Sequence, residues 1–315
     1  MAKHTIDPGI GEKYVTGPQR IMNPDGSFNL KREKIEWKYK NIYQDLIEAT
    51  WSKFFLMVIS AFFIANLIFA IIYYCIGINH LEGGQHNNIY EAFLNEFFFS
   101  VQTFTTVGYG SLAPRGLWMN MVSSIEALTG LMTFAVITGL LYGRFSKPKA
   151  LLVYSEKAII APFKEGKALM IRVANGRPNT LIEIEANMLL TMVEKTHVNK
   201  MRRYYQMHLD RATVYFLPLT WTIVHPIDEN SPFHGKSHEE ILESAPEILV
   251  MLKGYDETFS QTVYSRSSYL VHDIEWNARF LPAFGTDKDG KTIFELDKVG
   301  LYEKLDSHTN PKLLS

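Results

Sequence analysis

The sequence predicts a two-part protein, with a helical membrane domain followed by a soluble β-sandwich domain. Two long segments that are almost free of charge predict membrane spans, and an alternating apolar and polar pattern after residue 150 predicts β-strands. The connection between the two spans holds a third apolar segment that is too short to cross a bilayer, which predicts a re-entrant helix. A chain of 315 residues has room for both parts.

Composition excludes several classes of function. The net charge is −1, from 32 basic and 33 acidic residues, so no basic excess exists to bind nucleic acid. The single cysteine, Cys75, excludes an intrachain disulfide and a multi-cysteine metal site. We find no nucleophile–base pair, phosphate loop or metal-spaced histidine cluster, so we expect neither an enzyme nor a resident cofactor. The first residues lack an apolar stretch, and we expect no cleavable signal peptide.

Both predicted spans are long enough to cross a membrane. Phe54 to Ile76 carries no charge and would extend roughly 34 Å as a helix, against a hydrocarbon core of about 30 Å. Leu117 to Gly143 carries one charge, Glu126, and its greater length implies tilt. Basic residues precede the first span and follow the second, whereas the connection has only Arg115, so both termini are predicted to be cytoplasmic. The rings expected in an outer aromatic belt are Tyr73, Tyr74 and Trp118.

The connection between the spans carries the strongest motif. Ala92 to Phe104 is the short apolar segment, and Thr105-Thr106-Val107-Gly108-Tyr109-Gly110 follows it directly. Irregular backbone at membrane depth is tolerated only where it lines a water- or ion-filled path. Thr106 to Tyr109 offer four carbonyl oxygens in series, and Gly108 and Gly110 tolerate the dihedral angles that turn carbonyls toward one axis. One chain forms only one wall of such a cage, so four copies are required. TVGYG is a known potassium-channel filter, and selectivity is inferred here from that match.

The order of span, re-entrant helix, filter and span resembles the pore of potassium channels, and the whole chain is similar to the inward-rectifier potassium channel family of the prokaryotic KirBac type. The similarity extends from about Arg20 to Phe284. The matching stretches are Ala158-Ile159-Ile160-Ala161-Pro162, Arg172-Val173-Ala174-Asn175, His225-Pro226-Ile227-Asp228-Glu229-Asn230-Ser231-Pro232 and Arg266-Ser267-Ser268-Tyr269. This resemblance implies a homotetramer in the plasma (inner) membrane that conducts K⁺ passively. The residues implied to bind K⁺ are Thr106, Val107, Gly108, Tyr109 and Gly110.

After Lys149 the apolar pattern takes a period of two, and the resemblance implies an immunoglobulin-like domain there. Ile182, Ile184, Ala186, Met188 and Leu190 alternate with polar residues. Further strands are predicted at Ala168–Val173, Tyr204–Leu209, Thr220–Val224, Ile248–Leu252 and Phe259–Tyr264, and one helix at Ser237–Ser244. The predicted boundaries are a cytoplasmic N-terminal segment at 1–36, a slide helix at 37–52, a pore domain at 53–149, a β-sandwich at 150–285 and a loosely ordered tail at 286–315.

The segment before the first span predicts an interfacial helix. Trp37 to Trp51 places apolar residues near one face, which is typical of a helix along the inner leaflet and also of a helix packed on its own protein. The resemblance places gate residues at Phe134 and Tyr142 of the second span, where helix packing is the alternative. Anionic phospholipid binding is one interpretation of the basic residues at the inner headgroups, and simple anchoring is the other. These basic residues are Lys53, Arg144, Lys147 and Lys149.

Inward rectification in this family depends on acidic residues that hold a polyamine or Mg²⁺ in the pore. The cavity position is Phe134 here, and the two cytoplasmic ring positions are Glu183 and Lys253. Glu126 is either a pore charge or a hydrogen-bonded brace behind the filter. We therefore expect weak rectification.

Two alternatives remain open at this point. A cation channel of weak selectivity would differ in its reversal potential in mixed K⁺ and Na⁺. A membrane-tethered β-sandwich adaptor with a vestigial pore would show no ion flux in liposomes.

Overall fold

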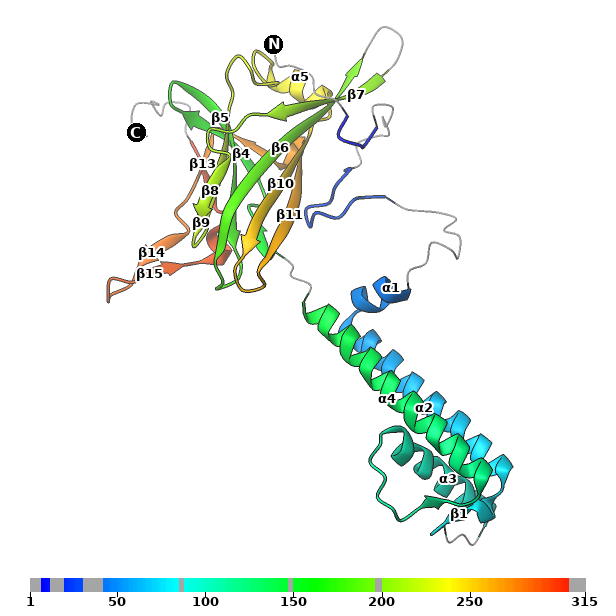
Figure 1. Cartoon of the computed structure of the whole chain (residues 1–315). Helices are drawn as coiled ribbons and strands as arrows, with labels where there is room; N and C mark the ends of the chain where they lie inside the picture. Colours follow the sequence, from blue (N-terminus) through cyan, green and yellow to red (C-terminus); the bar gives the residue numbers. More distant parts are fainter. Residues whose placement is uncertain are drawn as a thin grey trace. The chain divides into compact units, whose positions relative to one another are not determined.

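The computed structural model describes residues 7–11, 20–30, 42–84, 88–146, 150–195 and 200–305. The chain forms two compact units (Figure 1). The helical unit comprises Lys34–Lys147, and the β unit comprises Met1–Glu33 together with Pro148–Ser315. The N-terminal arm, defined here as residues 20–30, therefore packs with the β unit although the helical unit follows it in the chain.

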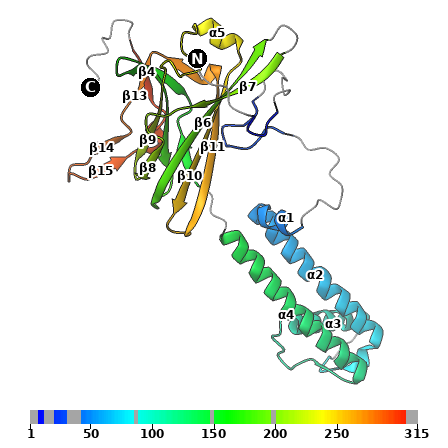
Figure 2. The ribbon, with the colours of Figure 1, turned by 45° about the horizontal axis from the view of Figure 1, so that its top comes forward.

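Two long helices and one shorter helix build the helical unit. α2 (Trp51–Ile76) and α4 (Leu117–Phe145) are both long and apolar enough to cross a membrane, which confirms the two predicted spans. α3 (Ile89–Phe104) packs against both (Figure 2). It begins before the predicted Ala92 because the side chain of Asn88 accepts a hydrogen bond from the Glu91 N–H and caps the first turn. A two-stranded sheet joins the segments on either side of α3 and the filter, through β1 (Leu81–Glu82) and β2 (Ala113–Pro114).

The helix before the first span is shorter than predicted. α1 spans Ile42–Glu48, and the prediction of a continuous helix over 37–52 is wrong at its C-terminal end. Thr50 has a ψ of 152°, an extended conformation that separates α1 from α2. Residues 37–41 of the predicted helix lie outside the described residues.

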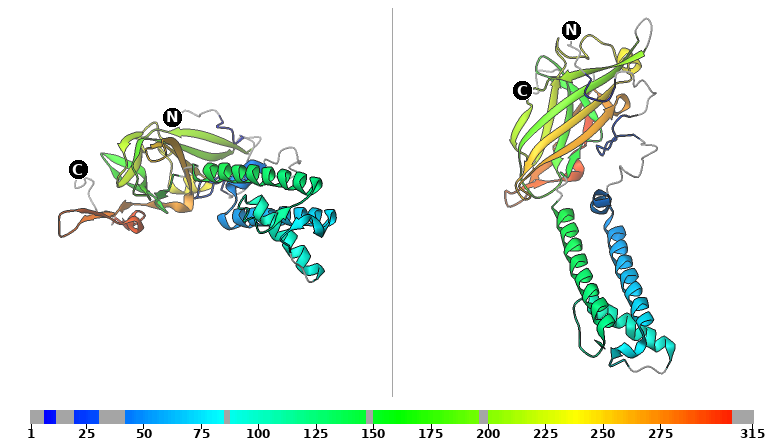
Figure 3. Two further views of the ribbon diagram at one scale, coloured as in Figure 1. Left: turned by 60° about the horizontal axis from the view of Figure 1, so that its bottom comes forward. Right: turned by 45° about the vertical axis from the view of Figure 1, so that its right-hand side comes forward.

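The β unit is a sandwich of two five-stranded sheets (Figure 3). The first sheet has the order β11-β10-β6-β7, with β8 also paired to β6. Its strands are β6 (Leu181–Lys195), β7 (Lys200–Met207), β8 (Thr213–Phe216), β10 (Glu247–Asp256) and β11 (Gln261–Leu270). The second sheet has the order β12-β4-β5-β3, with β9 also paired to β5. Its strands are β3 (Leu152–Tyr154), β4 (Ala158–Phe163), β5 (Gly166–Asn175), β9 (Thr220–Pro226) and β12 (Ile274–Trp276).

The sandwich core lies between the inner faces of these sheets. Residues of β6 at alternate positions are buried there against β5 and β9, and each such side chain contributes about 1.5–3 kcal/mol of burial. These core residues include Ile184, Ala186, Met188, Leu190, Leu169, Ile171, Val173 and Ile223. The predicted alternation is thus confirmed over most of β6. The predicted helix is also confirmed as α5 (His238–Glu243), which begins with a capping box between Ser237 and Glu240.

A β-bulge shifts the alternation at the start of β6. Glu183 and Ile184 lie opposite the single residue Gly254 of β10, and Glu183 has a φ of 50°. As a result Leu181, instead of the predicted Ile182, joins the buried core.

The prediction of a loosely ordered tail after Gly285 is wrong as far as Leu305. β14 (Phe284–Thr286) pairs with β15 (Thr292–Phe294), and β13 (Ala278–Phe280) pairs with β16 (Tyr302–Lys304). Ala278 is buried against Ile159 and Ala161 of β4. A few apolar contacts of this kind order the segment. The prediction relied on its polar average composition, which does not reveal single buried residues.

Candidate ion-conduction site

The filter segment starts where α3 ends. Thr105 caps α3, and its hydroxyl donates to the Val101 carbonyl oxygen at 2.7 Å. The next amides fold back onto the helix end, since the Val107 and Gly108 N–H groups donate to the Gln102 carbonyl oxygen at 3.0 and 3.3 Å. The end of α3 therefore fixes where the filter begins.

The filter backbone enters the left-handed region at three positions. φ is 51° at Gly108 and 79° at Gly110, which confirms that these glycines serve a conformation that other residues disfavour. Thr106 also has a φ of 58°, which the sequence did not indicate. Its N–H donates to the Thr103 carbonyl oxygen at 3.0 Å, and this bond helps to hold the conformation. The filter residues are exposed in the single chain, and Tyr109 is 78% exposed. One copy therefore does not enclose an ion path.

Glu126 lies in a buried hydrogen-bonded cluster, which we call the brace. The hydroxyl of Tyr73 on α2 donates to one carboxylate oxygen of Glu126, and Ser100 on α3 donates to the other at 2.5 Å. The Ser100 Oγ also lies 3.1 Å from the backbone and side-chain oxygens of Asn66 on α2. Cluster members come from all three helices, and each is buried. This geometry favours the bracing interpretation of Glu126. It also shows that Tyr73 belongs to the interior, contrary to the predicted aromatic belt, whereas Trp118 is exposed.

A second buried carboxyl group lies on α3. Glu96 is 1% exposed, and its Oε2 atom has no hydrogen-bond partner among the described residues. Glu96 lies one helical turn before Ser100, so both residues occupy one face of α3. Sequence reasoning missed Glu96, Ser100 and Asn66. The available signal was a charge or an amide inside a segment that is otherwise apolar.

A glycine permits close contact between the inner span and the end of α3. A Cβ atom on Gly130 of α4 would lie 2.0 Å from the Phe104 carbonyl oxygen, well inside van der Waals contact. Phe104 is the last residue of α3, directly before the filter. Gly130 thus sets the spacing between α4 and the filter, a role that no sequence pattern indicated.

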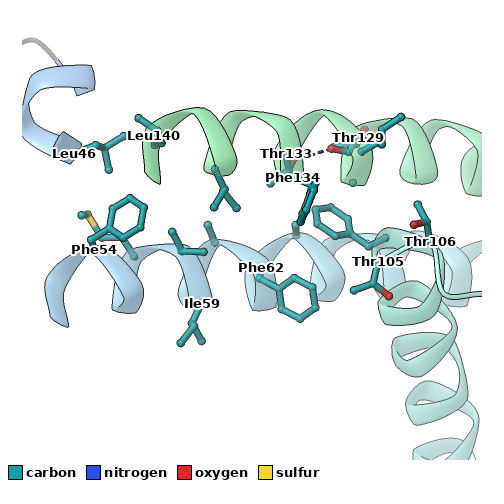
Figure 4. A pocket seen from close by; sticks show the side chains of 18 residues that line it. Leu46, Phe54, Ile59, Phe62, Thr105, Thr106, Thr129, Thr133, Phe134 and Leu140 are labelled. Carbon is teal, nitrogen blue, oxygen red and sulfur yellow. Dashed lines mark hydrogen bonds between the residues drawn. The ribbon is translucent and has the colours of Figure 1, made fainter. Parts of the chain in front are cut away.

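The predicted gate residues lie on exposed parts of α4. A groove of about 970 Å³ runs between α2 and α4 from the end of α3, and apolar side chains line most of it. Figure 4 shows Phe134 on α4 directed toward α2, with Thr106 of the filter at one end of the groove. Phe134 is 71% exposed and Tyr142 is 74% exposed. Both side chains are therefore largely exposed in the single chain, and their gating role stays a prediction.

Arg144 binds the end of α1, a contact that neither the lipid interpretation nor the anchoring interpretation predicted. Its Nη1 atom donates to the carbonyl oxygens of Leu46 and Ile47 at 2.5 and 2.9 Å, and Nη2 donates to that of Ala49 at 2.6 Å. The guanidinium also lies 4.5 Å from the ring centroid of Trp51. The planar guanidinium group, which we call the Arg144 fork, caps three carbonyl oxygens and so joins the cytoplasmic end of α4 to α1. Both Nη atoms thus bind main-chain oxygens, and lipid binding by Arg144 stays a prediction.

The remaining predicted site residues are separate from this cluster. Lys53 is exposed at the start of α2, and Lys147 and Lys149 lie outside the described residues. Glu183 is exposed at the bulge of β6, and Lys253 is exposed on β10 opposite Glu185.

Comparisons with known proteins cover nearly the whole chain. The family described as "Inward rectifier potassium channel C-terminal domain" matches residues 152–311, and the family described as "Ion channel" matches residues 57–147. The inward rectifier potassium channel Kirbac3.1 of Paramagnetospirillum magnetotacticum is 35% identical over 292 residues, which is 91% of this chain and 97% of that protein. The mouse ATP-sensitive inward rectifier potassium channel 15 is 27% identical, over 95% of this chain and 84% of its own length. The mouse G protein-activated inward rectifier potassium channel 3 is 28% identical, over 93% and 79%.

Proposed function

The chain belongs to the inward rectifier potassium channel family, and from this premise we propose how it works. It is a channel and acts by passive conduction of K⁺ across the membrane. Four copies would place their Thr106–Gly110 segments around one axis and complete the filter. The observation that carries this proposal is the TTVGYG segment at the end of α3, with left-handed backbone at both of its glycines.

Mixed-ion flux in liposomes tests the filter. Gly108→Ala should lower K⁺-selective flux at least tenfold while the tetramer persists, because a Cβ at positive φ distorts the carbonyl cage. Val107→Ile is the matched control, since it keeps the backbone and should keep the K⁺ over Na⁺ preference. A Gly108→Ala variant with unchanged preference would refute the filter assignment and favour a weakly selective cation channel.

The gate is proposed to lie at the cytoplasmic end of α4. Tyr142 is exposed there, two residues before the Arg144 fork that binds α1. Replacement of Tyr142 by alanine should raise basal flux, because a bulky ring would leave the inner mouth of the pore. Equal flux at matched protein incorporation would show that Tyr142 packs against another copy and does not close the pore.

Anionic phospholipid is proposed to inhibit the channel through Lys53, Lys147 and Lys149. Each basic residue near an anionic surface contributes about 1 kcal/mol of attraction. Arg144 is proposed to act differently, by holding α1. Replacing the three lysines by glutamine should remove the lipid response, while Arg144→Lys should change basal flux and leave that response in place. A retained lipid response in the triple variant would contradict the site.

A further inference from the structure

Glu96 is a buried acid that the proposed conduction path does not use. Its side chain is 1% exposed, on the face of α3 that also buries Ala92, Phe99 and Ser100. α3 packs against both α2 and α4, so this face lies in the interior of the helical unit. The Oε2 atom of Glu96 is buried without a hydrogen-bond partner among the described residues. A polar atom in this state is costly, and its presence requires an explanation.

The neighbours of Glu96 are mostly apolar. Phe99, one turn further along α3, packs against Tyr73 of α2, with the two ring centroids 5.1 Å apart. Met119 of α4 joins these rings in one buried cluster. The Tyr73 hydroxyl lies within electrostatic range of both Glu96 and Glu126. Glu96 is therefore buried in an apolar layer next to the brace.

Few titratable groups face this layer in the described part of the helical unit. α2 presents Tyr73 to Glu96, and α4 presents Glu126. Other titratable groups on α2, in the connection and in the first turn of α3 are at least partly exposed to solvent, namely Tyr74, His80, Glu82, Tyr90, Glu91 and Arg115.

Positive charge in the helical unit lies away from this layer. Lys53 is exposed at the start of α2, and Arg144 binds carbonyl oxygens at the end of α1. Arg115 in the connection pairs with Glu82, and both side chains are mostly exposed. Residues 42–84 and 88–146 contain no further lysine or arginine. An ionised Glu96 would thus lack a counter-charge within the described chain.

The donors of the brace serve one acid and not two. The Tyr73 hydroxyl donates to one carboxylate oxygen of Glu126, and the Ser100 hydroxyl donates to the other. These donors stabilise a negative charge on Glu126 and leave none for Glu96. Two carboxyl groups at one buried site are not both ionised, because their charges repel and desolvation of each is costly. The acid without donors is the one that keeps its proton.

We propose that Glu96 is a proton-binding site of the folded channel, and that its neutral form positions α3 for the filter. Loss of the proton to hydroxide in the bulk water would place two negative charges around the Tyr73 hydroxyl and force α3 away from its neighbours. Gln102 near the end of α3 accepts from the Val107 and Gly108 N–H groups, so a shift of α3 moves the start of the filter. The positioning role rests on the proposed function, whereas the proton site does not.

Infrared spectroscopy of the full-length channel in liposomes detects the proton without any need for conduction. Exposed carboxyl groups are ionised at neutral pH, so the carbonyl band of protonated acid reports buried groups. Glu96→Gln should reduce this band, because the amide matches the neutral acid in size and charge but does not absorb there. Glu82→Gln removes an exposed acid of the same unit and should leave the band unchanged. A band of equal area in wild type and Glu96→Gln would overturn the proton site.

The pH dependence of melting separates a bound proton from simple packing. The unfolded chain releases this proton above about pH 4.3, whereas the folded channel keeps it. Each further pH unit therefore lowers the folding constant of wild type about tenfold per subunit, a loss that Glu96→Gln avoids. The melting temperature of Glu96→Gln should exceed that of wild type by a margin that widens from about pH 5 to about pH 8. A constant margin, or a Glu96→Gln chain that does not assemble, would contradict the site.

Reversal potentials in mixed K⁺ and Na⁺ test the positioning role. Buried glutamates release their protons as high as about pH 8–9, so a scan from neutral pH to about pH 9.5 covers this step. Wild type and Glu82→Gln should lose at least threefold in K⁺ over Na⁺ preference across the scan, and Glu96→Gln should keep its preference. Level selectivity in wild type would overturn the positioning role. If wild type conducts no K⁺, the proposed function fails, and the infrared and melting data still decide whether Glu96 holds a proton.

Discussion

Tyr73 illustrates what a single hydroxyl group contributes behind the filter. Its O–H and that of Ser100 donate hydrogen bonds to the buried Glu126 carboxylate. Tyr73→Phe keeps the ring and removes one donor, so the folded tetramer should lose about 1–3 kcal/mol of stability. Thermal dissociation of the tetramer in detergent measures this loss.

The neighbouring residue provides the control for this prediction. Tyr74 lies on the same helix and is 37% exposed, so Tyr74→Phe should leave the dissociation temperature unchanged. Equal melting of the Tyr73→Phe and Tyr74→Phe tetramers would show that the brace does not stabilise the pore.

His225 predicts a dependence of stability on pH in the β unit. Its Nδ1 lies 2.7 Å from the His208 carbonyl oxygen and must donate to it, so Nε2 accepts from the Ser231 hydroxyl at 2.8 Å. This arrangement requires a neutral ring, and burial lowers the pKa of His225 to about 4. The unfolded chain, with a pKa near 6.5, takes up the proton first. Stability is therefore complete above pH 6.5 and falls by up to about 3 kcal/mol as the pH drops toward 4.

Replacing the ring by an amide tests this interpretation. His225→Gln can still donate to the His208 carbonyl oxygen and accept from Ser231, without a group that titrates in this range. The melting temperature of the full chain should fall less between pH 7 and pH 5 in this variant than in wild type. Identical pH dependence in the two proteins would assign the acid sensitivity to another group.

At the residue scale, a role was predictable from sequence where the backbone conformation alone requires a particular residue type. Gly108 and Gly110 were identified from sequence because few other residues accept a positive φ. Tyr73 was misplaced because its hydroxyl partner, Glu126, lies on another helix, and composition does not reveal which side chains meet. The contacts of Arg144 with α1 were unpredictable for the same reason, since its partners are carbonyl oxygens and no pattern of residue types marks them.

At the scale of elements, the contact between α3 and α4 leads to a prediction. Gly130→Ala would place a Cβ against the Phe104 carbonyl oxygen, which must then move together with the start of the filter. Overpacking of this kind costs about 1–3 kcal/mol, and we expect lower tetramer stability and lower K⁺ over Na⁺ preference. Reversal potentials in mixed ions measure the second effect.

A second glycine on the same helix separates packing from helix propensity. A Cβ on Gly139 would meet nothing within 4 Å in the chain as described. Gly139→Ala should therefore preserve selectivity, since it only favours the helix, by about 1 kcal/mol. Equal loss of selectivity in both variants would show that stiffening of α4, and not the Phe104 contact, is responsible.

Elements were predictable from period and length, and their ends were not. The two spans and most strands follow from uncharged runs and alternation. The start of α3 depends on the Asn88 cap, and the end of α1 depends on the extended Thr50. The bulge at Glu183 depends on the register between β6 and β10, and the pattern of one strand alone does not reveal that register.

At the scale of the whole molecule, the proposed tetramer repeats every charge four times, and this repetition decides the strength of rectification. A blocking cation needs fixed negative charge, and moving one charge through the membrane potential is worth roughly 2.3 kcal/mol per 100 mV. The resemblance predicts Phe134 at the cavity position and the exposed Lys253 at one ring position, and Glu126 is held by hydrogen bonds in the brace. Glu183 is the acid that remains at a predicted ring position.

We therefore expect weak and shallowly voltage-dependent block by internal spermine. Phe134→Asp should strengthen it and Glu183→Gln should weaken it, both measured as the voltage dependence of block in patches. Steep block of the unmodified channel would mean that Glu126 or another acid faces the ions.

The N-terminal arm imposes an order on the making of the protein. Ile21 leaves the ribosome early, yet the Glu247 carboxylate that receives its N–H is 226 positions later in the chain. Strand β4 likewise pairs in parallel with β12, which is synthesised after every other strand of its sheet. Contacts so distant in sequence form late, because the intervening chain must be ordered first. Docking of the arm is thus a sign that the sandwich is complete, and a chain stalled before Glu247 would reach the membrane with its first residues unattached.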